Sequence, residues 1–360
     1  MVEKERMSNF ELLRIFSILL IISFHYVYKG NFVFEALTVN KMIVNYFTMF
    51  GEIGVNLFIL ISGYFMIHSN KIKTKKIVLL LIEVLFYNLL SLLIVSHFEW
   101  RIFISMLSFK DFFPTIYGTY WFTTAYILLI IISPYINRLI KNLSFKEFSH
   151  LVLILICLYS IIPTLFGIRL NNTESLLYYN RFIWIIIIYM IGAYISLYRE
   201  KISIFSKGRG FYIVTTILIS LLALFIIYII EIFPSFFNQL GIHSSTYLWR
   251  PNSILILLWS LSLFLLFMGI RIQSRIINTL ASTTLGIYLL HDGKIQHVLW
   301  NNIFKNSTHT YSRFLIIHIL IAVSIIFIVG CFIDLIRQYL ANKIVLFFDD
   351  SKRFIKKRLS

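Results

Sequence analysis

The chain has 360 residues, of which 59% are hydrophobic and only 14% are charged, and its mean hydropathy is +0.84. No soluble globular protein of this length carries such a composition, so the sequence predicts a polytopic membrane protein. The formal net charge of +17 would suggest nucleic-acid binding in a soluble protein, but in a membrane protein it indicates cytoplasmic loops that follow the positive-inside rule. We therefore expect the lipid bilayer as a partner, and no nucleic acid.

Ten apolar segments are long enough to cross a bilayer, which predicts an all-α bundle of about ten transmembrane helices. The predicted spans are residues 10–29, 45–68, 77–97, 120–136, 150–166, 181–198, 211–231, 252–270, 280–300 and 313–336.

Lysine and arginine are distributed unevenly between the two sides of this arrangement. With the N-terminus inside, 22 of the 33 fall in cytoplasmic stretches and six in outer loops, which predicts a multi-pass protein of the cell membrane with both termini in the cytoplasm. No linker rich in Pro, Gly or Ser divides the chain, so we expect one membrane domain, residues 1–340. Residues 341–360 form a basic cytoplasmic tail whose mixed apolar and basic side chains fit an interfacial segment.

The first predicted span carries two ionisable residues, Arg14 and His25, eleven positions apart. At 3.6 residues per turn this spacing places both on one helix face, roughly 16 Å apart. Ionisable groups at this depth are costly and usually face a bundle interior or a wet cavity, where they mark a working site. The alternative is an arginine that snorkels to the inner interface and a histidine that satisfies an interhelical hydrogen bond.

Three further spans carry residues of interest. Gly54 and Gly63 lie nine positions apart in the second span, a pattern that favours a helix-packing face, with Asn56 as a polar exception. Glu83 in the third span must be protonated or paired, and a site Arg or His is a candidate partner. The aromatic residues that begin the fourth span, Tyr120-Trp121-Phe122, are explained by an interfacial aromatic belt.

The ninth predicted span carries Thr284, Tyr288 and His291 at positions i, i+4 and i+7. This spacing puts the hydroxyl groups on the helix face that carries the imidazole. Two interpretations stay open: an interhelical hydrogen bond, or a second site residue at a depth that His25 can reach.

Taken together, these motifs resemble the integral-membrane acyltransferase 3 family over about residues 8 to 336. Their order and their placement on successive spans make the combination specific. The residues that carry the resemblance are Arg14 with His25, Gly54-Val55-Asn56-Leu57-Phe58 to Ser62-Gly63-Tyr64, Tyr120-Trp121-Phe122, and Gly286-Ile287-Tyr288-Leu289-Leu290-His291.

The resemblance implies a bacterial membrane O-acetyltransferase with ten spans. Such an enzyme takes an acyl group from a cytoplasmic acyl-CoA, commonly acetyl from acetyl-CoA, and places it on a hydroxyl of a surface polysaccharide or lipid-linked sugar. In the family, the residues that match Arg14 and His25 are the functional pair, and His291 is a further match. The chain departs from the pattern at Asp292-Gly293, where relatives often carry an apolar residue and Pro. We expect no appended esterase-like domain of the kind found in some members.

The chemistry of acyl transfer suggests roles for these residues. A neutral imidazole suits removal of the hydroxyl proton, so His25 is the predicted general base, with a transient acyl carrier as the alternative. Arg14 would bind the phosphates of the donor or assist the thioester carbonyl. Asn56, Tyr288 and His291 are candidate oxyanion stabilisers, Glu83 is a candidate supporting residue, and no metal is expected.

Two functions from other classes compete with this prediction. A secondary transporter also places ionisable residues near glycine-containing spans, and Gly51, Gly54 and Gly63 would mark such a span. A flippase or polymerase of glycan precursors would likewise be a basic polytopic bundle. The halves of the chain show no convincing internal repeat, and the outer loops carry few charges, which argues against both alternatives.

Overall fold

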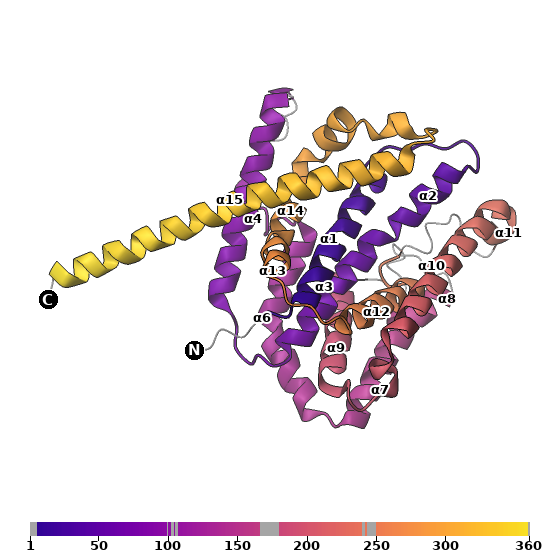
Figure 1. Cartoon of the computed structure of the whole chain (residues 1–360), viewed down its shortest axis with the longest axis horizontal. Coiled ribbons are helices and arrows are strands. Elements are labelled where there is room, and N and C mark those ends of the chain that lie inside the picture. Colours follow the sequence, from indigo (N-terminus) through magenta and orange to yellow (C-terminus); the bar gives the residue numbers. More distant parts are fainter. Residues whose placement is uncertain are drawn as a thin grey trace.

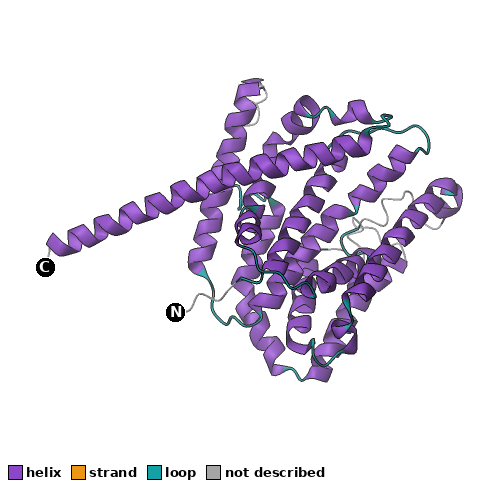
Figure 2. Cartoon of the chain, viewed as in Figure 1, coloured by secondary structure: helices purple, strands orange, loops and turns teal. Residues whose placement is uncertain are grey.

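The computed structural model describes residues 6–98, 100, 101, 104, 107–165, 180–239, 242 and 250–358. Within these residues the regular structure is helical throughout, without β-strands (Figure 2). The predicted all-α fold class is therefore confirmed.

Eight helices in the described part of the chain are long and apolar enough to cross a membrane. Two of them are composite, because α2 (Val39–Thr48) continues into α3 (Phe50–Met66), and α7 (Phe145–Ile156) continues through a π-helical turn into α8 (Ile162–Leu165). The others are α1 (Ser8–Tyr28), α4 (Thr74–Phe98), α6 (Trp121–Asn142), α9 (Arg181–Tyr198), α10 (Arg209–Ile232) and α15 (Leu315–Arg358), of which Leu315–Lys343 forms the candidate span.

Two of the ten predicted spans are not among these eight helices. The segment predicted at 252–270 forms α12 (Ile254–Met268), an apolar helix of 15 residues. The segment predicted at 280–300 is not one helix, because it divides into α13 (Arg275–Ser282), α14 (Thr284–His291) and short 3₁₀ and π turns. Gly293 has a φ of +77°, a left-handed conformation that glycine adopts readily and that ends the helix after His291.

Close helix packing holds α1 and α3 together at the centre of the bundle (Figure 1). A Cβ atom at Gly54 would lie 2.7 Å from the backbone carbonyl oxygen of Ser17 on α1. On another face of α3, a Cβ at Gly63 would lie 2.1 Å from the carbonyl oxygen of Tyr189 on α9. Glycine thus lets three helices approach closely, as the small-residue pattern of the second span predicted.

The C-terminal helix α15 packs against α1 and α14 and then extends away from the bundle (Figure 1). It continues through the predicted boundary at residues 340 and 341 and ends at Arg358. The side chains from residue 344 onward lie outside the described part, so the interfacial role of the tail stays a prediction.

Candidate active site

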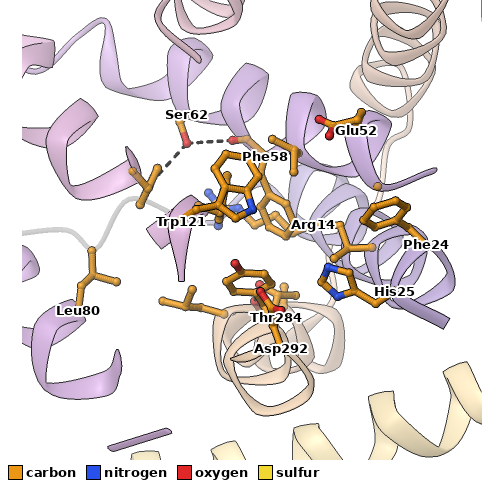
Figure 3. A pocket seen from close by; sticks show the side chains of 18 of the residues that line it. Arg14, Phe24, His25, Glu52, Phe58, Ser62, Leu80, Trp121, Thr284 and Asp292 are labelled. Atoms are coloured by element: carbon orange, nitrogen blue, oxygen red, sulfur yellow. Dashed lines mark hydrogen bonds between the residues drawn. The ribbon is translucent and has the colours of Figure 1, made fainter. Parts of the chain in front are cut away.

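A cavity of about 640 Å³ lies inside the bundle, alongside α1. Its lining side chains come from α1, α3, α4, α6, α9 and the segment from α13 to Gln296, and those labelled in Figure 3 converge on one space. Both Arg14 and His25 line it. The 3.6-residue period of α1 therefore brings the two ionisable residues of the first span to one cavity.

One end of the cavity, called here the Arg14 end, is rich in positive charge. Arg6, Arg14 and Lys76 line this end together with one carboxylate, that of Glu11. Arg14 Nη1 donates to both carboxylate oxygens of Glu11, at 2.8 and 2.9 Å, so its remaining N–H groups are left for a ligand. Three cations against one carboxylate give the end a net positive charge that suits an anionic ligand.

The walls of the Arg14 end carry hydroxyl groups as well as charge. Lys76 Nζ donates to Tyr126 Oη at 3.1 Å, and Ser62 Oγ lies 3.5 Å from the same oxygen (Figure 3). Lys76 precedes the apolar part of α4, and its side chain turns inward to the cavity. This end therefore offers donors of several kinds around an open space.

The opposite end, called here the Glu52 end, carries charges of both signs. It is lined by His25, Glu52, Trp121, Arg181 and Asp292. Since α3 runs antiparallel to α1, Gly51 near the start of α3 packs against Phe24 near the end of α1. The Glu52 end therefore lies at the opposite end of α1 from Arg14. The side chain of Asn180 accepts hydrogen bonds from the backbone N–H groups of Phe182 and Ile183 and so begins α9 at residue 181.

His25 and His291 are neighbours at this end. Their ring centroids lie 5.0 Å apart. His291 Nδ1 lies 2.6 Å from the carbonyl oxygen of Ile287; since a carbonyl only accepts, Nδ1 donates and Nε2 keeps a free lone pair. Nδ1 of His25 and Nε2 of His291 are both buried without a hydrogen-bond partner among the described residues.

Tyr288 lines the cavity, with its ring centroid 6.5 Å from that of His25. Its hydroxyl is buried and has no hydrogen-bond partner in the described part of the protein. Thr284, one turn earlier in α14, lines the cavity too. The face of α14 that carries Thr284 and Tyr288 therefore lies toward His25. A hydroxyl on this face could donate a hydrogen bond to the carbonyl oxygen of a bound ligand.

Three predicted site residues do not line the cavity. His291 is buried beside His25, and Asn56 and Glu83 have partners of their own. Asn56 accepts a hydrogen bond from Trp184 Nε1 at 3.2 Å and lies 3.5 Å from Ser260 Oγ, which joins α3 to α9 and α12. Glu83 pairs with Arg337 on α15 at 2.8 Å, rather than with a site Arg or His. Both residues thus hold helices together.

Several lining residues were not singled out from the sequence. Glu11 lies one helical turn before Arg14, a spacing that predicts an ion pair. Glu52 is a carboxylate inside a predicted span, the same signal that drew attention to Glu83. Arg181 and Lys76 reach the cavity only through the packing of distant segments, which the sequence alone does not give. Asp292 was noted in the sequence as a departure from the family pattern and not as a site residue.

These features define a multi-pass membrane protein with a charged cavity inside its helix bundle. The described residues contain no group of three His, Cys, Asp or Glu side chains placed to hold a metal ion.

Residues 7–333 match a family profile described as an acyltransferase domain, and the chain belongs to the acyltransferase 3 family. Comparison with curated proteins and with solved structures gives no match. The family supports acyl transfer as the activity, which requires an acyl donor and an acceptor.

Proposed function

We propose that this protein is a membrane O-acyltransferase that takes an acetyl group from cytoplasmic acetyl-CoA, or another short acyl group from the corresponding acyl-CoA. The acceptor is a hydroxyl of a surface polysaccharide or of a lipid-linked sugar. The observation that carries the proposal is the single cavity lined by Arg14 near one end and His25 near the other. A donor that enters at the Arg14 end would meet an acceptor at the Glu52 end.

The net positive charge of the Arg14 end supports a phosphate-bearing donor. Arg6, Arg14 and Lys76 offer charged donors there, and guanidinium presents a planar fork that matches phosphate oxygens. Glu11 orients Arg14 through two contacts to one guanidinium nitrogen. In this proposal the donor phosphates bind at this end, and the acyl arm extends along α1 toward His25.

His25 serves as the general base. Its neutral ring takes the proton of the acceptor hydroxyl, and the hydroxyl oxygen attacks the thioester carbonyl carbon. The carbon–sulfur bond then breaks, and the leaving thiolate takes the proton from the imidazolium. Tyr288 supplies the candidate hydrogen bond to the carbonyl oxygen as negative charge develops, because its hydroxyl lines the site without another partner among the described residues.

His291 acts as a positioning residue for His25. A small rotation of either ring would let His25 Nδ1–H donate to the free lone pair of His291 Nε2, since the centroids lie 5.0 Å apart. That hydrogen bond would satisfy two buried nitrogen atoms, each of which otherwise costs about 1–3 kcal/mol. It would also fix the His25 tautomer that leaves Nε2 unprotonated as the base.

The test is transfer of labelled acetyl from acetyl-CoA. Purified protein incubated with [1-¹⁴C]acetyl-CoA and a glycan fraction of the source membrane is expected to place label on base-labile esters of the glycan. His25→Ala should abolish the transfer, while His150→Ala, which removes an exposed histidine of α7, should not affect it. Label that stays on coenzyme A, or a His25→Ala variant with normal transfer, would contradict the proposal.

A further inference from the structure

Glu52 is a buried carboxylate in a candidate membrane span and has no use in the proposed reaction. The residue is 9% exposed, and it lines the cavity (Figure 3). It makes no hydrogen bond and no ion pair within 4.0 Å to the described residues. The guanidinium of Arg181 offsets its charge only from beyond ion-pair distance. A carboxylate kept in such a place indicates a ligand that donates a hydrogen bond to it.

The groups around Glu52 combine a flat aromatic surface with hydrogen-bonding side chains. The guanidinium of Arg181 lies 4.6 Å from the ring centroid of Trp121. Asp292 accepts a hydrogen bond from Gln296, and both line the same end of the cavity. The indole ring therefore has charged and amide groups within the same small space.

This combination suits a sugar ring better than the other ligands of a membrane enzyme. Carboxylate and amide oxygens accept hydrogen bonds from hydroxyls, guanidinium donates to ring and hydroxyl oxygens, and an indole face packs on the apolar face of a ring. The carboxylates of Glu52 and Asp292 are matched by the cations of Arg181 and Lys29, which also line the cavity. This end therefore has no net charge to attract an anionic sugar. An acyl chain would leave the Glu52 carboxylate without a hydrogen-bond donor.

The position of Glu52 relative to His25 places this end of the cavity beside the proposed general base. Gly51 packs directly on Phe24, since a Cβ at that glycine would lie 2.5 Å from the Phe24 ring. Because the two helices run antiparallel, the residues that follow, Glu52 and His25, lie only about 3 Å apart along the bundle axis. Both line the cavity. A ring held by Glu52 would present a neighbouring hydroxyl to His25.

We infer that Glu52, Arg181 and Trp121 form the acceptor subsite, and that this subsite takes a neutral, hydroxyl-bearing sugar ring. Asp292 and Gln296 complete it. The inference rests on the proposed function for its place in the reaction, but it makes a prediction about binding that does not require transfer.

Binding of sugars to the purified protein, followed by tryptophan fluorescence, tests the subsite without acetyl-CoA. The probes are three neutral trisaccharides, maltotriose, mannotriose and chitotriose, with trigalacturonic acid as the anionic counterpart. At least one neutral probe is expected to bind more tightly than the anionic one. Failure of all three neutral probes, or tighter binding of trigalacturonic acid, would overturn the inference.

Variants separate the subsite from general effects on folding. Glu52→Gln keeps the shape of the side chain and is expected to weaken binding about tenfold or more, the effect of losing a charged hydrogen-bond acceptor. Trp121→Ala should weaken binding similarly, while Trp121→Phe retains part of it. Glu200→Gln is the matched control, because that side chain is 87% exposed. Unchanged binding by Glu52→Gln and Trp121→Ala would contradict the subsite.

The two proposals fail in different ways. If sugars bind with the expected variant effects while labelled acetyl-CoA gives no transfer, the O-acetyltransferase proposal is wrong and the sugar subsite stands. If transfer proceeds normally in Glu52→Gln, with an unchanged KM for the glycan, the subsite is wrong and the O-acetyltransferase proposal stands.

Discussion

Substitution of Gly54 by alanine tests whether close packing of α1 on α3 positions the site. The added Cβ would lie 2.7 Å from both the Ser17 carbonyl oxygen and Ile21 Cγ1. Ile21 has a side chain that can rotate, but the Ser17 oxygen is backbone and moves only with α1. Ordinary contact begins at 3.4 Å, so α1 must move by about 0.7 Å.

The size of the effect follows from this displacement. Overpacking a well-packed contact costs about 1–3 kcal/mol, and the better helix propensity of alanine returns about 0.5–1 kcal/mol. We therefore expect net destabilisation of about 1–2 kcal/mol, or a melting temperature lowered by roughly 2–6 °C. Because α1 carries both Arg14 and His25, acetyl transfer should fall about tenfold, since a 1 Å misplacement can cost about 100-fold.

The assay compares Gly54→Ala with Gly210→Ala. A Cβ at Gly210 on α10 would meet no atom within 4 Å, so this control should keep wild-type activity and an equal or higher melting temperature. Both variants are purified in the same detergent, and thermal unfolding and labelled acetyl transfer are measured on the same samples. Wild-type stability together with wild-type transfer in Gly54→Ala would refute the close contact of α1 and α3.

Further predictions concern the donor, the base and the helix pairing. Arg14→Lys keeps the charge but loses the planar fork, so the KM for acetyl-CoA should rise about tenfold with little change in kcat; an unchanged KM would remove Arg14 from donor binding. A neutral imidazole base makes kcat/KM rise with pH and level off above the pKa of the imidazole, and a kcat/KM that falls as the pH rises through the acid range would count against His25. His291→Ala should lower kcat and leave acetyl-CoA binding intact, with partial recovery in His291→Asn, which restores an acceptor; equal kcat in all three proteins would exclude the positioning role. Glu83→Gln leaves Arg337 with Asp334 as its remaining partner and should lower the free energy of unfolding by about 1–3 kcal/mol with little effect on the KM for acetyl-CoA; thermal and denaturant unfolding that match wild type would show the pair to be dispensable.

Local pattern in the sequence predicted much of the fold and part of the candidate site. The apolar run of α1 and its helical period were enough to place Arg14 and His25 on one face, and both line one cavity. The spacing of Thr284 and Tyr288 similarly placed two hydroxyls on one face of α14. Such inferences succeed because the period of a helix is a local property.

Other features depend on contacts between distant parts of the chain. Glu83 and Arg337 are 254 positions apart, and nothing in either segment specifies the other as its partner. The break after His291 was missed because the segment is apolar enough to span a bilayer, whereas the left-handed φ of Gly293 is a property of the folded backbone. Asn56 was a reasonable site candidate from its depth, yet its hydrogen-bonding groups are directed to Trp184 and Ser260.

The most direct test of the account is an experimental structure with a non-reactive thioether analogue of acetyl-CoA bound. We predict phosphate density beside Arg14, Arg6 and Lys76, an arm that extends along α1, and the acyl end next to the His25 ring. A donor bound outside the cavity, or with its acyl end away from His25, would contradict it.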